Sequence, residues 1–95
     1  DCSGYVCWVY NQNGYDIGRT TANGLWQKSQ HISEAEAKPG DLVFFKGTYD
    51  TPGMSHVGIY LGNGKMVSAG DPIKYADIHS SYWQQYLAGF GRLSK

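Results

Sequence analysis

The sequence has 95 residues, 15% of them aromatic, with thirteen glycines and a formal net charge of zero. This length fits a single domain with a modest core. The eight Lys and Arg are scattered without a basic stripe, which argues against nucleic acid and anionic membrane surfaces as partners. No apolar run is long enough to span a bilayer, so membrane insertion is not expected.

The chain opens with a predicted helix. Small and polar residues at 1–4 lead into an apolar run over 5–10. Apolar residues spaced by three and four predict a helix with one buried face. The run Asn-Gln-Asn-Gly at 11–14 is typical of a helix end, so this helix is expected to end near Asn11.

Two cysteines lie in this first helix. Cys2 falls in the first turn, where unpaired backbone N–H groups and the positive end of the helix dipole favour a thiolate over a thiol. Cys2 is therefore a candidate nucleophile, although a capping residue or half of a disulfide would have the same appearance. Cys7 would lie about 140° around the helix from Cys2, which argues against a bridge between them. Cys7 is predicted to pack as a small apolar residue.

A second helix is predicted from Ala22 to about Gln30, with Thr20 or Thr21 as its N-cap. His31 follows at the C-terminal end of this helix, where a partial positive charge suits the dipole. We interpret His31 as a surface or capping residue.

The second half of the chain predicts strands separated by Gly, Pro and Asn turns. Asn63-Gly64 is the strongest turn signal, because both residues tolerate the positive φ values of a hairpin. A brief helical turn is expected at 82–85, and the last strand is expected at the edge of the sheet. The predicted strands cover 42–45, 55–61, 66–69, 75–78 and 86–93. Helices followed by strands indicate an α+β domain with an antiparallel sheet.

A nucleophilic cysteine needs a base, and His56 is the strongest candidate. It begins a strand of good quality, which gives an imidazole a rigid platform, and Gly58 on the same face leaves room for another group. A histidine at a strand edge bonded only to solvent is the alternative. His79 lies beside serines and is interpreted as a surface residue. The cysteines and histidines show no tetrahedral ligand spacing, so neither a metal nor a cofactor is expected.

Three motifs occur in order: Asp-Cys-Ser-Gly at 1–4, Pro-Gly-Asp-Leu-Val-Phe-Phe at 39–45 and Ser-His-Val-Gly-Ile-Tyr-Leu-Gly-Asn-Gly-Lys at 55–65. Together they resemble the NlpC-type cell-wall cysteine peptidases, a branch of the papain-like fold, and Arg-Thr-Thr at 19–21 is similar to that family as well. The resemblance implies one domain over 1–95, with N-terminal helices packed on a small antiparallel sheet. The family's Trp-Gly-Gly-rich segment before Asp-Cys is expected to be absent from this domain.

The resemblance also implies a function. Cys2 would be the thiolate nucleophile, His56 the base, and the substrate the stem peptide of peptidoglycan. Asp1, Ser3 and Ser55 match motif positions and are expected to contact the substrate; helix capping is an equally compatible role for Asp1 and Ser3. The family implies a location outside the cell or at the cell wall.

The residue that orients the base is open between two candidates. The family usually has His, Asn or Gln twelve residues after the base, where this chain has Ser68. If Asn63-Gly64 is a plain two-residue turn, His56 lies opposite Asp71, and Ser68 falls on the other face. A bulged or three-residue turn reverses this and restores Ser68. The family pattern favours Ser68.

Two other functions fit the same residues. A catalytically weak module that binds cell-wall peptides is suggested by Ser68 in place of the usual orienting residue. An amidase or transferase acting on a different substrate could use the same Cys–His pair.

Overall fold

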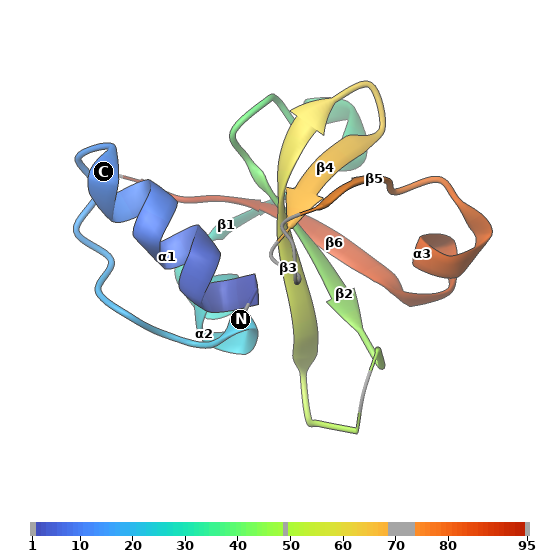
Figure 1. The fold of residues 1–95 in the computed structure, drawn as a ribbon, viewed down its shortest axis with the longest axis horizontal. Coiled ribbons are helices and arrows are strands. Elements are labelled where there is room, and N and C mark those ends of the chain that lie inside the picture. Colours follow the sequence, from blue (N-terminus) through green and yellow to red (C-terminus); the bar gives the residue numbers. More distant parts are fainter. Residues whose placement is uncertain (1, 49, 69–73, 95) are drawn as a thin grey trace.

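The computed structural model describes residues 2–48, 50–68 and 74–94 (Figure 1). It holds helices α1 (Cys2–Gln12), α2 (Ala22–Lys28) and α3 (Ser81–Tyr86), and a short 3-10 helix, η1 (Glu34–Glu36). The strands are β1 (Gln30–Ile32), β2 (Leu42–Lys46), β3 (Met54–Gly62), β4 (Lys65–Ser68), β5 (Lys74–Asp77) and β6 (Leu87–Arg92). Within the described ranges no helix is both long and apolar enough to cross a membrane.

The strands form one antiparallel sheet in the order β1-β6-β2-β3-β4-β5. Helices α1 and α2 cover one face, and α3 lies on the other (Figure 1). The α+β fold class is therefore confirmed. The element bounds also agree closely with the prediction for α1, whose apolar run supplies the buried Val6, Cys7 and Tyr10.

Strand β2 is buried on both of its faces. Leu42 and Phe44 belong to the core cluster under α1 and α2, whereas Val43 and Phe45 belong to the cluster on the α3 side. All four side chains are fully buried. This explains why the segment is continuously apolar instead of alternating, as a strand between two packed layers must be.

The prediction was wrong about the region after α2 and about the sheet edge. Helix α2 ends at Lys28 with Ser29 as its C-cap, and His31 lies in strand β1, not at a helix end. Strand β1 pairs with β6, so β6 lies inside the sheet between β1 and β2. The His31 ring stacks on Trp26, with centroids 3.5 Å apart, and its Nε2 lies 2.9 Å from the Trp26 carbonyl oxygen. The side chain thus caps α2 as expected, while its backbone is extended.

The register of the β3–β4 hairpin determines which face of the sheet Ser68 lies on. Asn63 and Gly64 have φ values of 54° and 77°, as the turn prediction required. The register shifts between Tyr60 and Gly62, so Ile59 lies opposite Val67. The next pair in this register is Gly58 and Ser68. The hairpin is therefore bulged, which puts Ser68 on the same face as His56.

Gly91 in β6 is a site where packing forbids a side chain. A Cβ atom there would lie 2.7 Å from Ser29 Cβ and 3.1 Å from Phe44 Cε2. We expect Gly91→Ala to lower the free energy of unfolding by about 1–3 kcal/mol, because Ser29 and Phe44 must shift. Urea unfolding measures this. Ala88→Ser, at an exposed position of the same strand, should change it by less than about 0.5 kcal/mol. Equal effects of both substitutions would contradict the packing argument.

Candidate active site

Cys2 is the first residue of α1 and is half-buried at a hollow of about 230 Å³ that is lined by both polar and apolar side chains. The walls come from the starts of α1, α2 and β3 and from the loop between β2 and β3. The lining residues are Cys2, Ser3, Thr21, Ala22, Asn23, Thr51, Pro52, Met54 and Ser55. The first turn of α1 also contributes backbone N–H groups. These groups have no hydrogen-bond acceptor within the helix, because no helical residue precedes them by a full turn.

Hydrogen bonds join the walls of this hollow. Asn23 Oδ1 in α2 accepts a bond of 3.0 Å from the backbone N–H of Met54 in β3. Arg19 Nη1 donates to Ser3 Oγ at 3.3 Å and to the Thr20 carbonyl at 2.5 Å, which ties the first turn of α1 to the approach to α2. The surroundings of Cys2 are therefore fixed by three separate segments of the chain. The predicted contact Asp1 lies outside the described residues.

Ser55 lines the hollow, but its hydroxyl is engaged elsewhere. Its side chain is fully buried, and Oγ accepts a 3.0 Å bond from the backbone N–H of Thr48. Oγ also lies 2.6 Å from Thr48 Oγ1 and donates to the Phe45 carbonyl at 3.4 Å. These bonds fasten the loop between β2 and β3. A direct substrate contact by Ser55 stays a prediction.

His56 is the third residue of β3 and lies directly opposite Phe45 in β2. Paired residues of an antiparallel sheet share a face, so the imidazole lies on the α3 side, whereas the neighbouring Val57 packs under α1. The ring centroid is 5.7 Å from Phe45 and 5.0 Å from Trp83. Its Nε2 is fully buried without a hydrogen-bond partner among the described residues. Burial lowers the pKa of His56, which favours the neutral ring.

The structure brings the predicted residues to one end of β3 without joining them in one cavity. Met54 and Ser55 line the hollow of Cys2, and the next residue, His56, projects from the other face of the sheet. Ser68 shares the face of His56 but makes no hydrogen bond to Nε2. Asp71 lies outside the described residues. Sequence reasoning missed Trp83, because nothing local in a short helical turn shows which distant ring it will meet.

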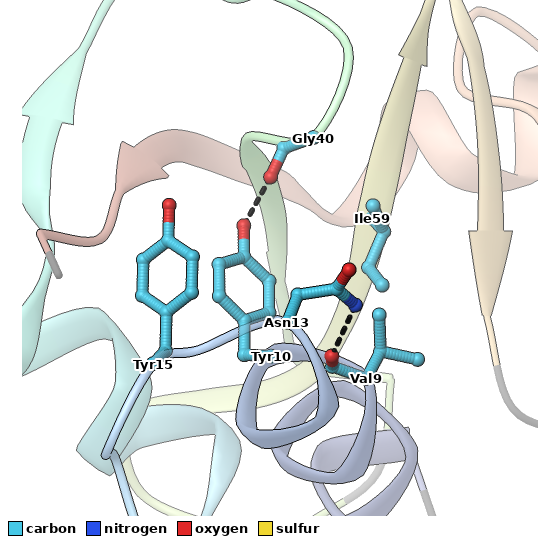
Figure 2. A pocket seen from close by; sticks show the side chains of 6 residues that line it. All are labelled: Val9, Tyr10, Asn13, Tyr15, Gly40 and Ile59. Carbon is cyan, nitrogen blue, oxygen red and sulfur yellow. Dashed lines mark hydrogen bonds between the residues drawn. The ribbon is translucent and has the colours of Figure 1, made fainter.

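A second hollow, of about 180 Å³, lies at the other end of α1 (Figure 2). Figure 2 shows the Tyr10 hydroxyl donating to the Gly40 carbonyl, with the Tyr15 ring beside it at a centroid distance of 4.7 Å. Burial, and then the proximity of Tyr15 and Asp41, raises the pKa of Tyr10, so its hydroxyl stays protonated. Among the described residues, no cysteine, histidine or carboxylate lines this hollow. We therefore assign no chemistry to it.

His79 is half-exposed, with Nε2 2.6 Å from Glu34 Oε2, as suits its interpretation as a surface residue. Over the ranges that the structure describes, no three His, Cys, Asp or Glu side chains are grouped to hold a metal ion. Cys7 is buried and carries a free thiol that lies 3.9 Å from the Thr20 carbonyl. Cys2, in contrast, lines a hollow.

Known proteins are similar to this chain over nearly its whole length. The model of the NlpC/P60 family matches residues 1–92. The "Probable endopeptidase p60" of Listeria monocytogenes serovar 1/2a is 50% identical over 94 residues, which are 98% of this chain and 19% of that protein. The "Probable peptidoglycan endopeptidase LytE" of Bacillus subtilis (strain 168) is 39% identical over 93 residues, 97% of this chain and 26% of that protein.

A solved structure from the same family is also similar to this chain. The crystal structure of an NLP/P60 family protein, similar to lipoprotein, from Staphylococcus aureus subsp. aureus Mu50 aligns with a TM-score of 0.94 and 43% identity. The alignment covers 100% of this chain and 32% of that one. The chain thus spans less than one third of each of these three proteins. The family model matches almost the whole length of the chain, and the chain shares its papain-like fold with the family's solved domains. The chain therefore belongs to the NlpC/P60 family.

Proposed function

We propose that this chain is a cysteine endopeptidase domain that hydrolyses amide bonds in the stem peptides of peptidoglycan, outside the cell or at the cell wall. The observation that carries the proposal is the position of Cys2, at the start of a helix and lining a hollow beside β3. Membership of the NlpC/P60 family supports the reaction class. A relative named a peptidoglycan endopeptidase supports the substrate class.

The reaction follows from the chemistry of a thiol and an imidazole. The Cys2 thiolate attacks the scissile carbonyl carbon after His56 has taken the thiol proton. Backbone N–H groups in the first turn of α1 donate to the oxyanion of the tetrahedral intermediate. The C–N bond then breaks, His56 returns the proton to the leaving amine, and a thioester remains on Cys2. Water hydrolyses this thioester and restores the thiol.

In this proposal the imidazole and the thiol meet at the end of β3, where Ser55 lines the hollow of Cys2 and His56 is the next residue. Nε2 is the buried ring nitrogen, which leaves Nδ1 to take the proton from Cys2. The lowered pKa of His56 supports a neutral ring that is ready to accept this proton.

The substrate is proposed to lie in the hollow beside Cys2. Ser3 and Ser55 line this hollow, and Asp1 precedes Cys2 in the sequence. These three residues are the proposed substrate contacts. Ser55 would act mainly through its backbone and through the loop that it fastens, since its hydroxyl bonds to Thr48.

The nucleophile is tested by Cys2→Ala. We expect the wild-type chain to release new amino groups from purified peptidoglycan and the variant to lose this activity by a factor on the order of 10³ or more. Mass spectrometry of the released muropeptides identifies the bond that is cut. Cys7→Ala is the matched control and should remain active, because the Cys7 thiol is buried. Release that survives Cys2→Ala would rule out Cys2 as the nucleophile.

A second candidate function is a module that binds cell-wall peptides without cleaving them. The unpartnered Nε2 of His56 favours it, because a ring that no hydrogen bond orients is a weak base. Iodoacetamide at pH 6 separates the two functions. The endopeptidase requires Cys2 to be alkylated about ten times faster than free cysteine, since only the thiolate reacts. Alkylation of Cys2 at or below the rate of free cysteine, with muropeptide binding retained, would favour the binding module.

Ser68 is the proposed orienting residue for His56. Catalytic hydrogen bonds are often unmade before substrate binds, and Ser68 lies on the face of the sheet from which His56 projects. We expect Ser68→Ala to lower kcat about fivefold to tenfold, the effect of one hydrogen bond. Ser68→Asn, whose amide oxygen reaches farther, should equal or exceed the wild type in kcat. Full activity of Ser68→Ala would exclude Ser68, and a loss in Asp71→Asn would then assign the role to Asp71.

A further inference from the structure

Two aromatic rings pack against the His56 ring from the same side, both in tilted arrangements. Trp83 lies 5.0 Å away with 30° between the planes, and Phe45 lies 5.7 Å away with 53° between them. Trp83 and Phe45 also contact one another, with centroids 4.6 Å apart. The three rings come from α3, β2 and β3, so each contact joins a different pair of elements.

No hydrogen bond holds the ring of His56 within the part of the chain that the structure describes. Nε2 is buried without a partner, although a buried ring nitrogen normally bonds to a carbonyl, a carboxylate or water. Ser68 is the polar side chain on the same face of the neighbouring strand, and it does not bond to Nε2. The contacts that fix the plane of the imidazole are therefore those with aromatic rings.

Trp83 is held firmly enough to act as a support. It packs against the core cluster on the α3 side, together with Tyr86 and Leu87. Gln84, the next residue of α3, donates a 2.8 Å bond from Nε2 to the Ile78 carbonyl, which ties the helix to the end of β5. The Tyr82 ring contacts the Trp83 ring in a T-shaped arrangement, with centroids 4.9 Å apart. The indole is thus packed between the helix and the sheet.

We infer that Trp83, together with Phe45, positions the His56 imidazole for the reaction by packing against it, in addition to the hydrogen bond proposed for Ser68. This inference rests on the proposed function. Trp83 is a positioning residue, because it contacts the base and not the reacting atoms. An imidazole that turns about its Cβ–Cγ bond would move its nitrogens away from the thiol and lose its alignment with it.

Two substitutions separate positioning from simple packing. Trp83→Leu keeps an apolar side chain but removes the ring, whereas Trp83→Phe keeps a ring face. We expect Trp83→Leu to lower kcat on the peptidoglycan substrate by about tenfold to a hundredfold with KM nearly unchanged. Trp83→Phe should keep most of the wild-type kcat. Gln85→Ala, an exposed position on the same helix, is the control and should match the wild type.

A second measurement does not depend on activity. Proton NMR titration of the imidazole signals reports His56 directly, with the signals of His31 and His79 as internal references. Burial lowers the pKa of His56, so removing the indole should raise it toward its ordinary value. Trp83→Leu should therefore show a higher midpoint than Trp83→Phe. If the substitutions only weakened the helix, both variants would unfold at a lower temperature. The titration midpoint of His56 would then be the same in the two variants.

The outcomes are distinct. A wild-type kcat together with an unmoved His56 midpoint in folded Trp83→Leu would overturn the inference while leaving the proposed function standing. A wild-type chain that releases no amino groups would overturn the proposed function itself, and with it the role of Trp83 in the reaction. A reduced kcat and a raised midpoint in Trp83→Leu, with both restored in Trp83→Phe, is the result that we expect.

Discussion

The pairing of β2 with β3 is the constraint on which the candidate site depends. Phe44 lies opposite Val57, and both pack under α1 and α2; Phe45 lies opposite His56, and both face α3. A slip of one residue would exchange the two faces. It would bring the imidazole into the apolar core beneath Cys7 and leave Val57 against Trp83. The buried character of β2 on both faces therefore fixes the position of His56 as well as the stability of the sheet.

Much of this arrangement could be predicted from local sequence. The apolar run after Cys2 predicts α1, and Asn63-Gly64 predicts the hairpin because both residues adopt positive φ. These signals are strong because they depend on the intrinsic preferences of neighbouring residues. The predicted roles of Asp1 and Asp71 concern residues outside the described ranges and stay predictions.

The remaining features depend on contacts between distant segments. Strand β1 has only three residues, and His31 looks like the end of a helix until β6 is placed beside it. The shift between Tyr60 and Gly62 could not be predicted, because both turn geometries are compatible with Asn-Gly, yet it decides which side chain shares the face of His56. The contact between Trp83 and His56 could not be predicted either, since it arises only when α3 packs across the sheet.

The unpartnered nitrogen of His56 connects the stability of the domain with its chemistry. Among the described side chains it is the one buried polar atom without a hydrogen bond, and such an atom costs about 1–3 kcal/mol of stability. The other buried polar residues show the usual pattern: Asp41 bonds to Arg92, and Ser55 bonds to Thr48. Buried polar atoms are normally hydrogen-bonded, and the places where a folded chain departs from this pattern tend to be functional or strained sites. The exception falls on the imidazole at the start of β3, next to the strand end that borders the thiol, so the way this ring gains a partner is what separates the two candidate functions.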